Sequence, residues 1–73
     1  MSEIKILTEV AGRICAIPAT VGAVVSDGDD LVLVEAMKME IPVPTTVGGK
    51  IKSILVRVDD VVEEGQTIAI VET

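Results

Sequence analysis

Apolar residues alternate with a period of two over several short runs, a pattern typical of half-buried β-strands. Such runs cover residues 31–34, 54–58 and 68–71. Segments with glycine or acidic residues, which favour turns, separate the runs at 21–23, 26–30, 59–60 and 63–66. Pro18, Pro42 and Pro44 are unsuited to helix interiors and confine their segments to sheet edges or bends. The pattern predicts about eight short strands and no helix.

The amino-acid composition supports an all-β interpretation. Valine and isoleucine together number 22, against 10 for leucine and alanine, and β-branched side chains favour the pleated surface of strands. Hydrophobic residues make up 49% of the chain, which is enough for a core. Because 73 residues are few for two domains, we expect a single domain over residues 1–73.

The chain contains an internal repeat. Shifted by 37 residues, the segment 3–35 aligns with 40–72 without a gap. Many aligned pairs are identical, among them Val10/Val47, Gly12/Gly49, Ile14/Ile51, Val24/Val61, Gly28/Gly65 and Glu35/Glu72. A repeat of this kind indicates two similar structural units. We therefore expect two four-stranded halves related by a quasi-two-fold axis, in a flattened antiparallel barrel or sandwich.

The segment 36–39 joins the two halves of the repeat. It lies between the predicted strands 31–36 and 39–43, so we expect it to form the tip of a tight hairpin. In the other half, the chain ends Met1 and Thr73 occupy the equivalent position. The repeat therefore predicts the hairpin tip at one end of the molecule and both termini at the other.

The hairpin tip has an unusual sequence. Two-residue hairpin turns of the primed types need φ > 0 and favour Gly, Asn or Asp, whereas this tip consists of Met37 and Lys38. In a primed turn such residues cost about 1–3 kcal/mol, and strain of this kind concentrates at functional sites. The flexible thioethers of Met37 and Met39 suit contact with another protein. We therefore predict that the tip is functional.

Composition excludes several function classes. Phe, Tyr, Trp and His are absent, which excludes aromatic stacking on nucleic-acid bases and histidine-based catalysis or metal binding. The net charge of −6 opposes binding to phosphate backbones, so we expect no nucleic-acid partner. The acidic turns lack the ligand spacing of a calcium loop, and we predict neither a metal site nor catalytic residues.

Cysteine usage and the chain start point to a reducing compartment. The single Cys15 has no partner for an internal disulfide, and we expect it to be a small buried hydrophobe. The N-terminus lacks the pattern of a signal peptide, and no apolar run is long enough to span a membrane. We therefore expect a cytoplasmic protein without membrane contacts.

Residues 35–40, with the sequence EAMKME, resemble the biotin-attachment motif of the biotinyl/lipoyl carrier domain family. The likeness continues through 41–44 and Gly49, which are similar to the strand and turn after the attachment lysine. Gly28 and Gly65 are similar to the paired turn glycines of the family. The resemblance covers essentially the whole chain and extends to biotin carboxyl carrier proteins and small free-standing biotin/lipoyl attachment proteins.

The chain also departs from the family pattern in two respects. Residues 9–12 read EVAG where the family has a stretch rich in proline and methionine. The usual Gly-Asp turn is replaced by Gly-Ala at 22–23 and by Asp-Asp at 59–60. These departures affect the expected turn geometry and leave the assignment unchanged.

The resemblance implies the biotinyl/lipoyl carrier fold and a non-catalytic carrier role. A biotin protein ligase would attach biotin to Lys38, and the arm would then carry a carboxyl group from a biotin carboxylase to a carboxyltransferase. We expect the domain itself to be monomeric. Contacts with these partner enzymes are expected from the flanking residues Glu35, Ala36, Met37, Met39 and Glu40. Solvated strand-end charges are an equally good interpretation of Glu35 and Glu40.

Two other functions remain as alternatives. A lipoyl carrier domain of a 2-oxoacid dehydrogenase or glycine cleavage type system would carry lipoate on Lys38. Such domains usually have an acidic residue before the lysine and a small residue after it, so methionine on both sides favours biotin. An unmodified structural or binding barrel would have no reason to keep the Met-Lys-Met tip. An independent enzyme would need a nucleophile–base pair or a metal site, and the sequence offers neither.

Overall fold

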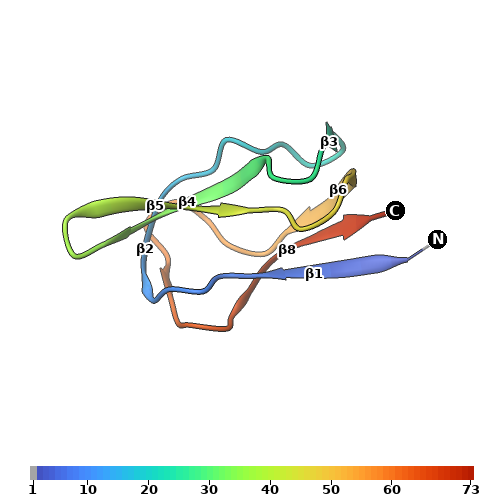
Figure 1. Cartoon of the computed structure of the whole chain (residues 1–73). Coiled ribbons are helices and arrows are strands. Elements are labelled where there is room, and N and C mark those ends of the chain that lie inside the picture. Colours follow the sequence, from blue (N-terminus) through green and yellow to red (C-terminus); the bar gives the residue numbers. More distant parts are fainter. Residues whose placement is uncertain (1) are drawn as a thin grey trace.

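The computed structural model describes residues 2–73 and shows an all-β architecture (Figure 1). Met1 lies outside the described residues, so its predicted place at the terminal end is not assessed. The strands are β1 (Glu3–Leu7), β2 (Gly12–Ala16), β3 (Val24–Val25), β4 (Asp30–Ala36), β5 (Met39–Pro44), β6 (Gly49–Ile54), β7 (Val61–Val62) and β8 (Thr67–Glu72). The prediction of about eight short strands is confirmed. Residues 2–73 include no helix long and apolar enough to cross a membrane.

The strands form two four-stranded antiparallel sheets with the orders β1-β8-β6-β3 and β5-β4-β2-β7. A shift of 37 residues converts β1 into β5, β4 into β8, β2 into β6 and β3 into β7. The second order is therefore the first with the two halves exchanged, as the predicted quasi-two-fold axis requires. Each sheet takes two strands from each half, so the halves interleave and neither forms a sheet of its own.

The hairpin tip and the chain ends lie at opposite ends of an elongated body. The body measures 36 × 19 × 18 Å, and the β4–β5 hairpin projects at the left of Figure 1, away from the C-terminus. At the far end the amide of Thr73 donates to the carbonyl of Ser2 at 2.8 Å. The predicted separation of tip and termini is confirmed for the described residues.

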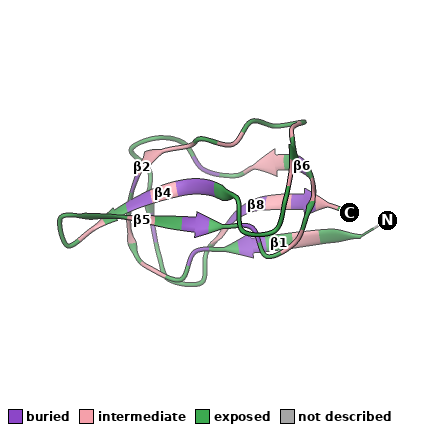
Figure 2. Cartoon of the chain, turned by 45° about the horizontal axis from the view of Figure 1, so that its top comes forward, coloured by how far each residue is buried: buried purple, intermediate pink, exposed green. Residues whose placement is uncertain are grey.

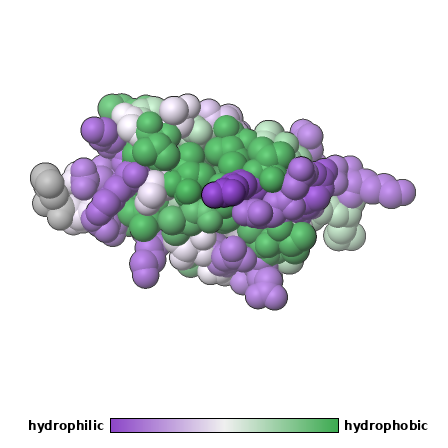
Figure 3. All heavy atoms as spheres, turned by 180° about the vertical axis from the view of Figure 1, so that it is seen from behind, coloured by the Kyte–Doolittle hydropathy of each residue, from purple (hydrophilic) through white to green (hydrophobic). Residues whose placement is uncertain are grey.

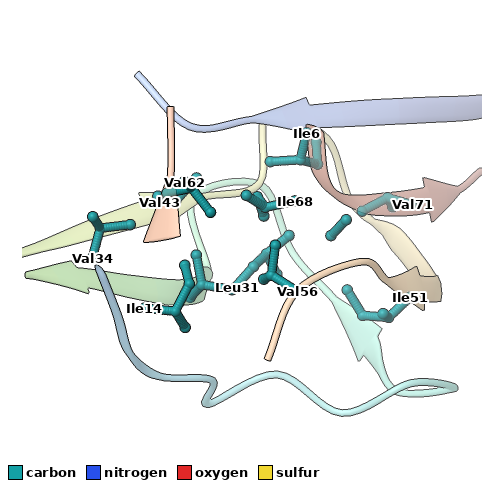
Figure 4. Close-up of a cluster of buried hydrophobic side chains, with 12 residues drawn as sticks. Ile6, Ile14, Leu31, Val34, Val43, Ile51, Val56, Val62, Ile68 and Val71 are labelled. Atoms are coloured by element: carbon teal, nitrogen blue, oxygen red, sulfur yellow. The ribbon is translucent and has the colours of Figure 1, made fainter. Parts of the chain in front are cut away.

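The core lies between the two sheets and consists of aliphatic side chains from both halves (Figure 4). Its buried members are Ile6, Ile14, Leu31, Val32, Val34, Val43, Ile51, Val56, Val62, Ile68, Ala69 and Val71. Burying a Val, Leu or Ile side chain completely stabilises a fold by about 1.5–3 kcal/mol. The core holds no aromatic side chain, so branched aliphatic residues fill it.

The strict alternation predicted for 31–34 is wrong at one point. Leu31 and Val32 are neighbours in the chain and both are fully buried. The pairing register with β5 shifts between Asp30 and Val32, and such a bulge turns consecutive side chains towards the same side. The equivalent residues of β8, Ile68 and Ala69, show the same pattern.

The predicted strand at 54–58 is also wrong beyond its first residue, because β6 ends at Ile54. From there the chain leaves one sheet and crosses to β7 in the other, so residues 55–58 have no continuous strand partner. Val56 is still buried, whereas Val58 is half exposed. The alternation that suggested a strand here reflects a crossover segment that contributes one side chain to the core.

Two equivalent glycines allow neighbouring strands to approach closely. A Cβ at Gly12 would overlap the carbonyl oxygen of Glu35 in β4 and lie 2.8 Å from a methyl of Val34. A Cβ at Gly49 would overlap the carbonyl oxygen of Glu72 in the same way. Gly12 therefore brings β2 close to the end of β4 from which the hairpin projects.

Two equivalent buried threonines close the turns after β1 and β5. The hydroxyl of Thr8 donates to the carbonyl of Val10 at 2.8 Å and accepts from the amide of Val10 at 3.2 Å. Thr45 forms the same pair of hydrogen bonds with Val47, at 2.6 and 3.2 Å. These bonds satisfy hydroxyls that would otherwise be costly to bury.

We predict that Gly28→Val and Gly65→Val each lower the free energy of unfolding by about 1–2 kcal/mol. Both glycines have left-handed backbones, with φ of 93° and 84°. A Cβ atom at either position would have no atom of a non-adjacent residue within 4 Å. The loss is therefore a backbone effect and should be similar at both sites in urea denaturation. Gly28→Asn and Gly65→Asn are the matched controls and should lose less, because asparagine tolerates this region. Valine variants as stable as the parent would contradict this explanation.

Candidate functional site

Lys38 lies at the tip of the hairpin formed by β4 and β5. Ala36 and Met39 are the last register partners of the two strands, so Met37 and Lys38 form a two-residue turn. Their φ angles are 53° and 62°. Positive φ at both central residues is the requirement of a type I′ turn, the geometry that matches the twist of a tight hairpin. The strand register and the turn together fix the position of the Lys38 backbone, from which the side chain with its amine extends.

The hairpin turn contains residues that its geometry does not favour. Among the described residues other than glycine, only Met37, Lys38 and Asp59 have positive φ. A Cβ in the left-handed region costs roughly 1–2 kcal/mol per residue, and Gly, Asn or Asp would reduce that cost. The hairpin therefore keeps Met37 and Lys38 at the expense of stability.

The side chains of the tip are exposed (Figure 2). Met37 is 94% exposed and Met39 is 64% exposed, so neither methionine fills a gap in the core. Lys38 is exposed as well, whereas Ala36 is half-buried at the end of β4. Two flexible apolar side chains thus accompany a lysine at the point farthest from the chain termini.

Three charged residues surround the base of the hairpin. Glu35 and Glu40 are direct register partners across β4 and β5, and both are exposed. Arg13 of β2 is the register partner of Glu35 on the other side of β4, and its guanidinium donates to Glu35 Oε1 at 3.2 Å. Arg13 also forms an ion pair with Asp59, from the turn before β7. The hydrogen bond that Arg13 donates to Glu35, aided by Asp59, raises the pKa of Arg13.

Arg13 is the residue at this site that sequence reasoning missed. The repeat pairs Arg13 with Lys50, so a cation recurs at this position of both halves. That signal does not indicate which carboxylates the cation meets, because Asp59 is 46 residues away along the chain. The contact exists because β2 lies between β4 and β7 in the sheet.

Other chemically distinctive groups lie outside the hairpin. Cys15, which we expected to be buried, is half-buried, and its thiol donates to the carbonyl of Leu33 at 3.4 Å. Carboxylates of the acidic turns accept from backbone amides, as in the bond from Ser26 N to Asp29 Oδ2 at 2.9 Å. Within residues 2–73, no group of three or more acidic or cysteine side chains is placed to hold a metal ion.

A groove of about 660 Å³ runs between β1 and β5, the outermost strands of the two sheets. Its lining is mainly aliphatic and includes Ile6, Val10, Ile41 and Val43. None of residues 35–40 lines it, so it is separate from the candidate site. The reverse of the molecule likewise has apolar side chains over its middle, with hydrophilic ones at both ends, and the hairpin end lies at the right of Figure 3.

Comparisons with known proteins agree with this architecture. The family model described as "Biotin-requiring enzyme", the biotin/lipoyl family, matches residues 3–71. The chain therefore belongs to this family. No curated protein matches the chain in a sequence search.

Two solved structures of carboxylases contain a region similar to this chain. The urea carboxylase of Kluyveromyces lactis matches with a TM-score of 0.93 and 35% identity, over 99% of this chain and 6% of that protein. A single-chain, multi-domain long-chain acyl-CoA carboxylase matches with a TM-score of 0.85 and 28% identity, over 97% of this chain and 7% of that protein. The chain thus corresponds to a small part of each of these proteins.

We predict that Met37→Asn raises the free energy of unfolding by about 1 kcal/mol, because asparagine tolerates the left-handed conformation at this turn. Urea denaturation of the unmodified protein measures the change. Met39→Asn is the matched control: Met39 is an exposed methionine in β5, outside the positive-φ positions, and should give no gain. Equal effects of the two substitutions would show that the turn is not strained.

Proposed function

We propose that the chain is a biotin carboxyl carrier domain and that Lys38 is the attachment residue. The observation that carries the proposal is an exposed lysine in a strained primed turn, at the end of the body opposite the termini. Membership of the biotin/lipoyl family supports the same role. In this proposal a biotin protein ligase forms an amide between Lys38 Nζ and the carboxyl group of biotin, with net loss of water.

The residues at the tip fit an attached arm. Lys38 supplies a primary amine with no ion-pair partner among the described residues, so no contact has to break before acylation. Acylation removes the lysine charge and changes the formal charge of the chain from −6 to −7. Biotin, when attached, supplies the ureido nitrogen that accepts and releases a carboxyl group.

The contribution of the protein itself is positional. The β4–β5 register and the two-residue turn hold the attachment point at the extremity of the body, where active sites of other proteins can receive it. Tethering gives a biotin carboxylase and a carboxyltransferase a high effective concentration of the arm without release and recapture. This role needs no catalytic residue in the chain, and we propose that it has none.

We propose further that residues 1–73 act as one monomeric cytoplasmic carrier domain. The structural neighbours are a urea carboxylase and an acyl-CoA carboxylase, which supports a partner system of this kind. Lipoate on Lys38 is the second candidate, because the matching family covers both groups. The intact mass of the protein from its native host separates biotin, lipoate and no modification.

We expect Lys38→Arg to abolish biotinylation, because the guanidinium group stays protonated and is a poor nucleophile. The measurement is streptavidin binding after co-expression with a biotin protein ligase. Lys50 is a lysine of β6 near the chain termini, and Lys50→Arg is the matched control, which should remain biotinylated. Streptavidin binding by Lys38→Arg, or a modified peptide containing Lys5, Lys50 or Lys52, would refute the assignment.

We expect modification and carboxyl transfer to depend on different features of the hairpin. Strand register and turn length set the position of the lysine and do not change when side chains are truncated. Met37→Ala and Met39→Ala should therefore still be biotinylated but support slower carboxylation, because the exposed methionines contact the partner enzymes. Insertion of one residue beside Lys38 should instead prevent biotinylation.

The two activities are measured separately for all three variants, as biotin incorporated and as carboxyl group transferred. Methionine variants that lose biotinylation, together with an insertion variant that keeps it, would reverse this division of roles.

A further inference from the structure

The attachment hairpin has a pair of like charges at its base. Glu35 of β4 and Glu40 of β5 are direct register partners, one pair below Ala36 and Met39. Directly opposed side chains of an antiparallel pair lie about 4.5–5.5 Å apart at Cβ, and like charges there are destabilising. β5 is the outermost strand of its sheet and pairs with β4 alone. The repulsion therefore acts to open the strand pair that holds Lys38.

Arg13 lies where it offsets this repulsion. It is the register partner of Glu35 on β2, and its guanidinium binds Glu35 Oε1 at 3.2 Å. A second ion pair, with Asp59, anchors the same guanidinium to the turn before β7. The φ of Asp59 is 78°, and its counterpart in the other half is Gly22, with φ of 90°. An aspartate thus occupies a left-handed position that the other half gives to glycine, and its carboxylate meets Arg13.

The opposite end of the molecule repeats the carboxylate pair with more compensation. Glu3 and Glu72 are register partners there, as Glu35 and Glu40 are at the hairpin. Lys52 forms an ion pair with Glu3, and Lys50 is the register partner of Glu72. Hydrogen bonding to Glu3 raises the pKa of Lys52, and the charge of Glu72 adds to the rise. Two lysines of β6 therefore face the two carboxylates.

The hairpin end lacks the second of these cations. The position equivalent to Lys52 is Cys15, whose thiol bonds to the backbone of β4. Among residues 2–73, no ion pair includes Glu40. The hairpin itself carries one positive charge, on Lys38, three residues after Glu35 and two before Glu40. Acylation removes this charge.

We propose that Arg13 is a positioning residue that keeps the attachment hairpin closed, and that it becomes more important once Lys38 has lost its charge. Arg13 contacts one carboxylate of the pair, Glu35, and once Lys38 is acylated the hairpin itself carries no positive charge. The role of Arg13 in the unmodified chain is independent of the proposed function, whereas its greater role after acylation rests on it.

Amide hydrogen exchange at Ala36 and Met39 tests this role, because it reports opening of the hairpin directly. Arg13→Met keeps a long apolar side chain and removes the charge, and should accelerate exchange at these amides by roughly two- to fivefold. The acceleration should be larger in biotinylated protein and in a Lys38→Met background, which removes the same charge without a ligase. Lys50→Met is the matched control and should leave the hairpin amides unchanged.

A second substitution shows whether the carboxylate pair is the cause. Glu40→Gln removes one of the opposed charges and should return exchange in the Arg13→Met variant to the rate of the parent. Equal acceleration with charged and uncharged residue 38, no rescue by Glu40→Gln, or an equal effect of Lys50→Met would each overturn the proposal. If the ligase leaves the parent unmodified, the proposed function fails, while the Lys38→Met comparison still decides the role of Arg13.

Discussion

The interleaving of the two halves of the repeat is the constraint on which the rest of the structure depends. Because each sheet combines two strands from each half, β1 and β3 pair only with strands of the second half, and β5 and β7 pair only with strands of the first. β4 illustrates the consequence: β2 and β5 flank it, and only the first of these belongs to the same half. The hairpin is therefore an extension of a strand that is held on both sides, and this gives its tip a fixed position.

Close approach of the strands sustains this arrangement. Gly12 and Gly49 have no side chain where β2 meets β4 and β6 meets β8, so the strand pairs reach distances that a Cβ would prevent. The aliphatic core between the sheets then closes without aromatic residues. The strained turn at Met37 and Lys38 lies outside this core, in exposed residues at one end of the body.

The two ends of the body share a backbone plan and differ in chemistry. At the terminal end, lysines of β6 face the carboxylate pair, and glycine takes the left-handed turn position. At the hairpin end, Arg13 faces the equivalent pair, and Asp59 replaces the glycine. A duplicated fold can therefore be compared with itself: features found at both ends belong to the architecture, and features found only at the hairpin end are candidates for function. Val24 and Val61 occupy equivalent positions, one at each end, and both are exposed. Their exposure is therefore a feature of the architecture.

The amino-acid sequence was sufficient to predict the strands, the duplication and the hairpin tip at Met37 and Lys38, because period-two alternation, turn residues and a gapless repeat are local or directly comparable signals. It was not sufficient at 31–34 and 54–58, where a bulge and a crossover between sheets decide which side chains are buried. The identical pair Thr8/Thr45 is visible in the repeat, yet its turn-closing role depends on burial. The contact of Arg13 with Asp59 depends on strand order, because β2 and β7 become neighbours only when the two halves interleave.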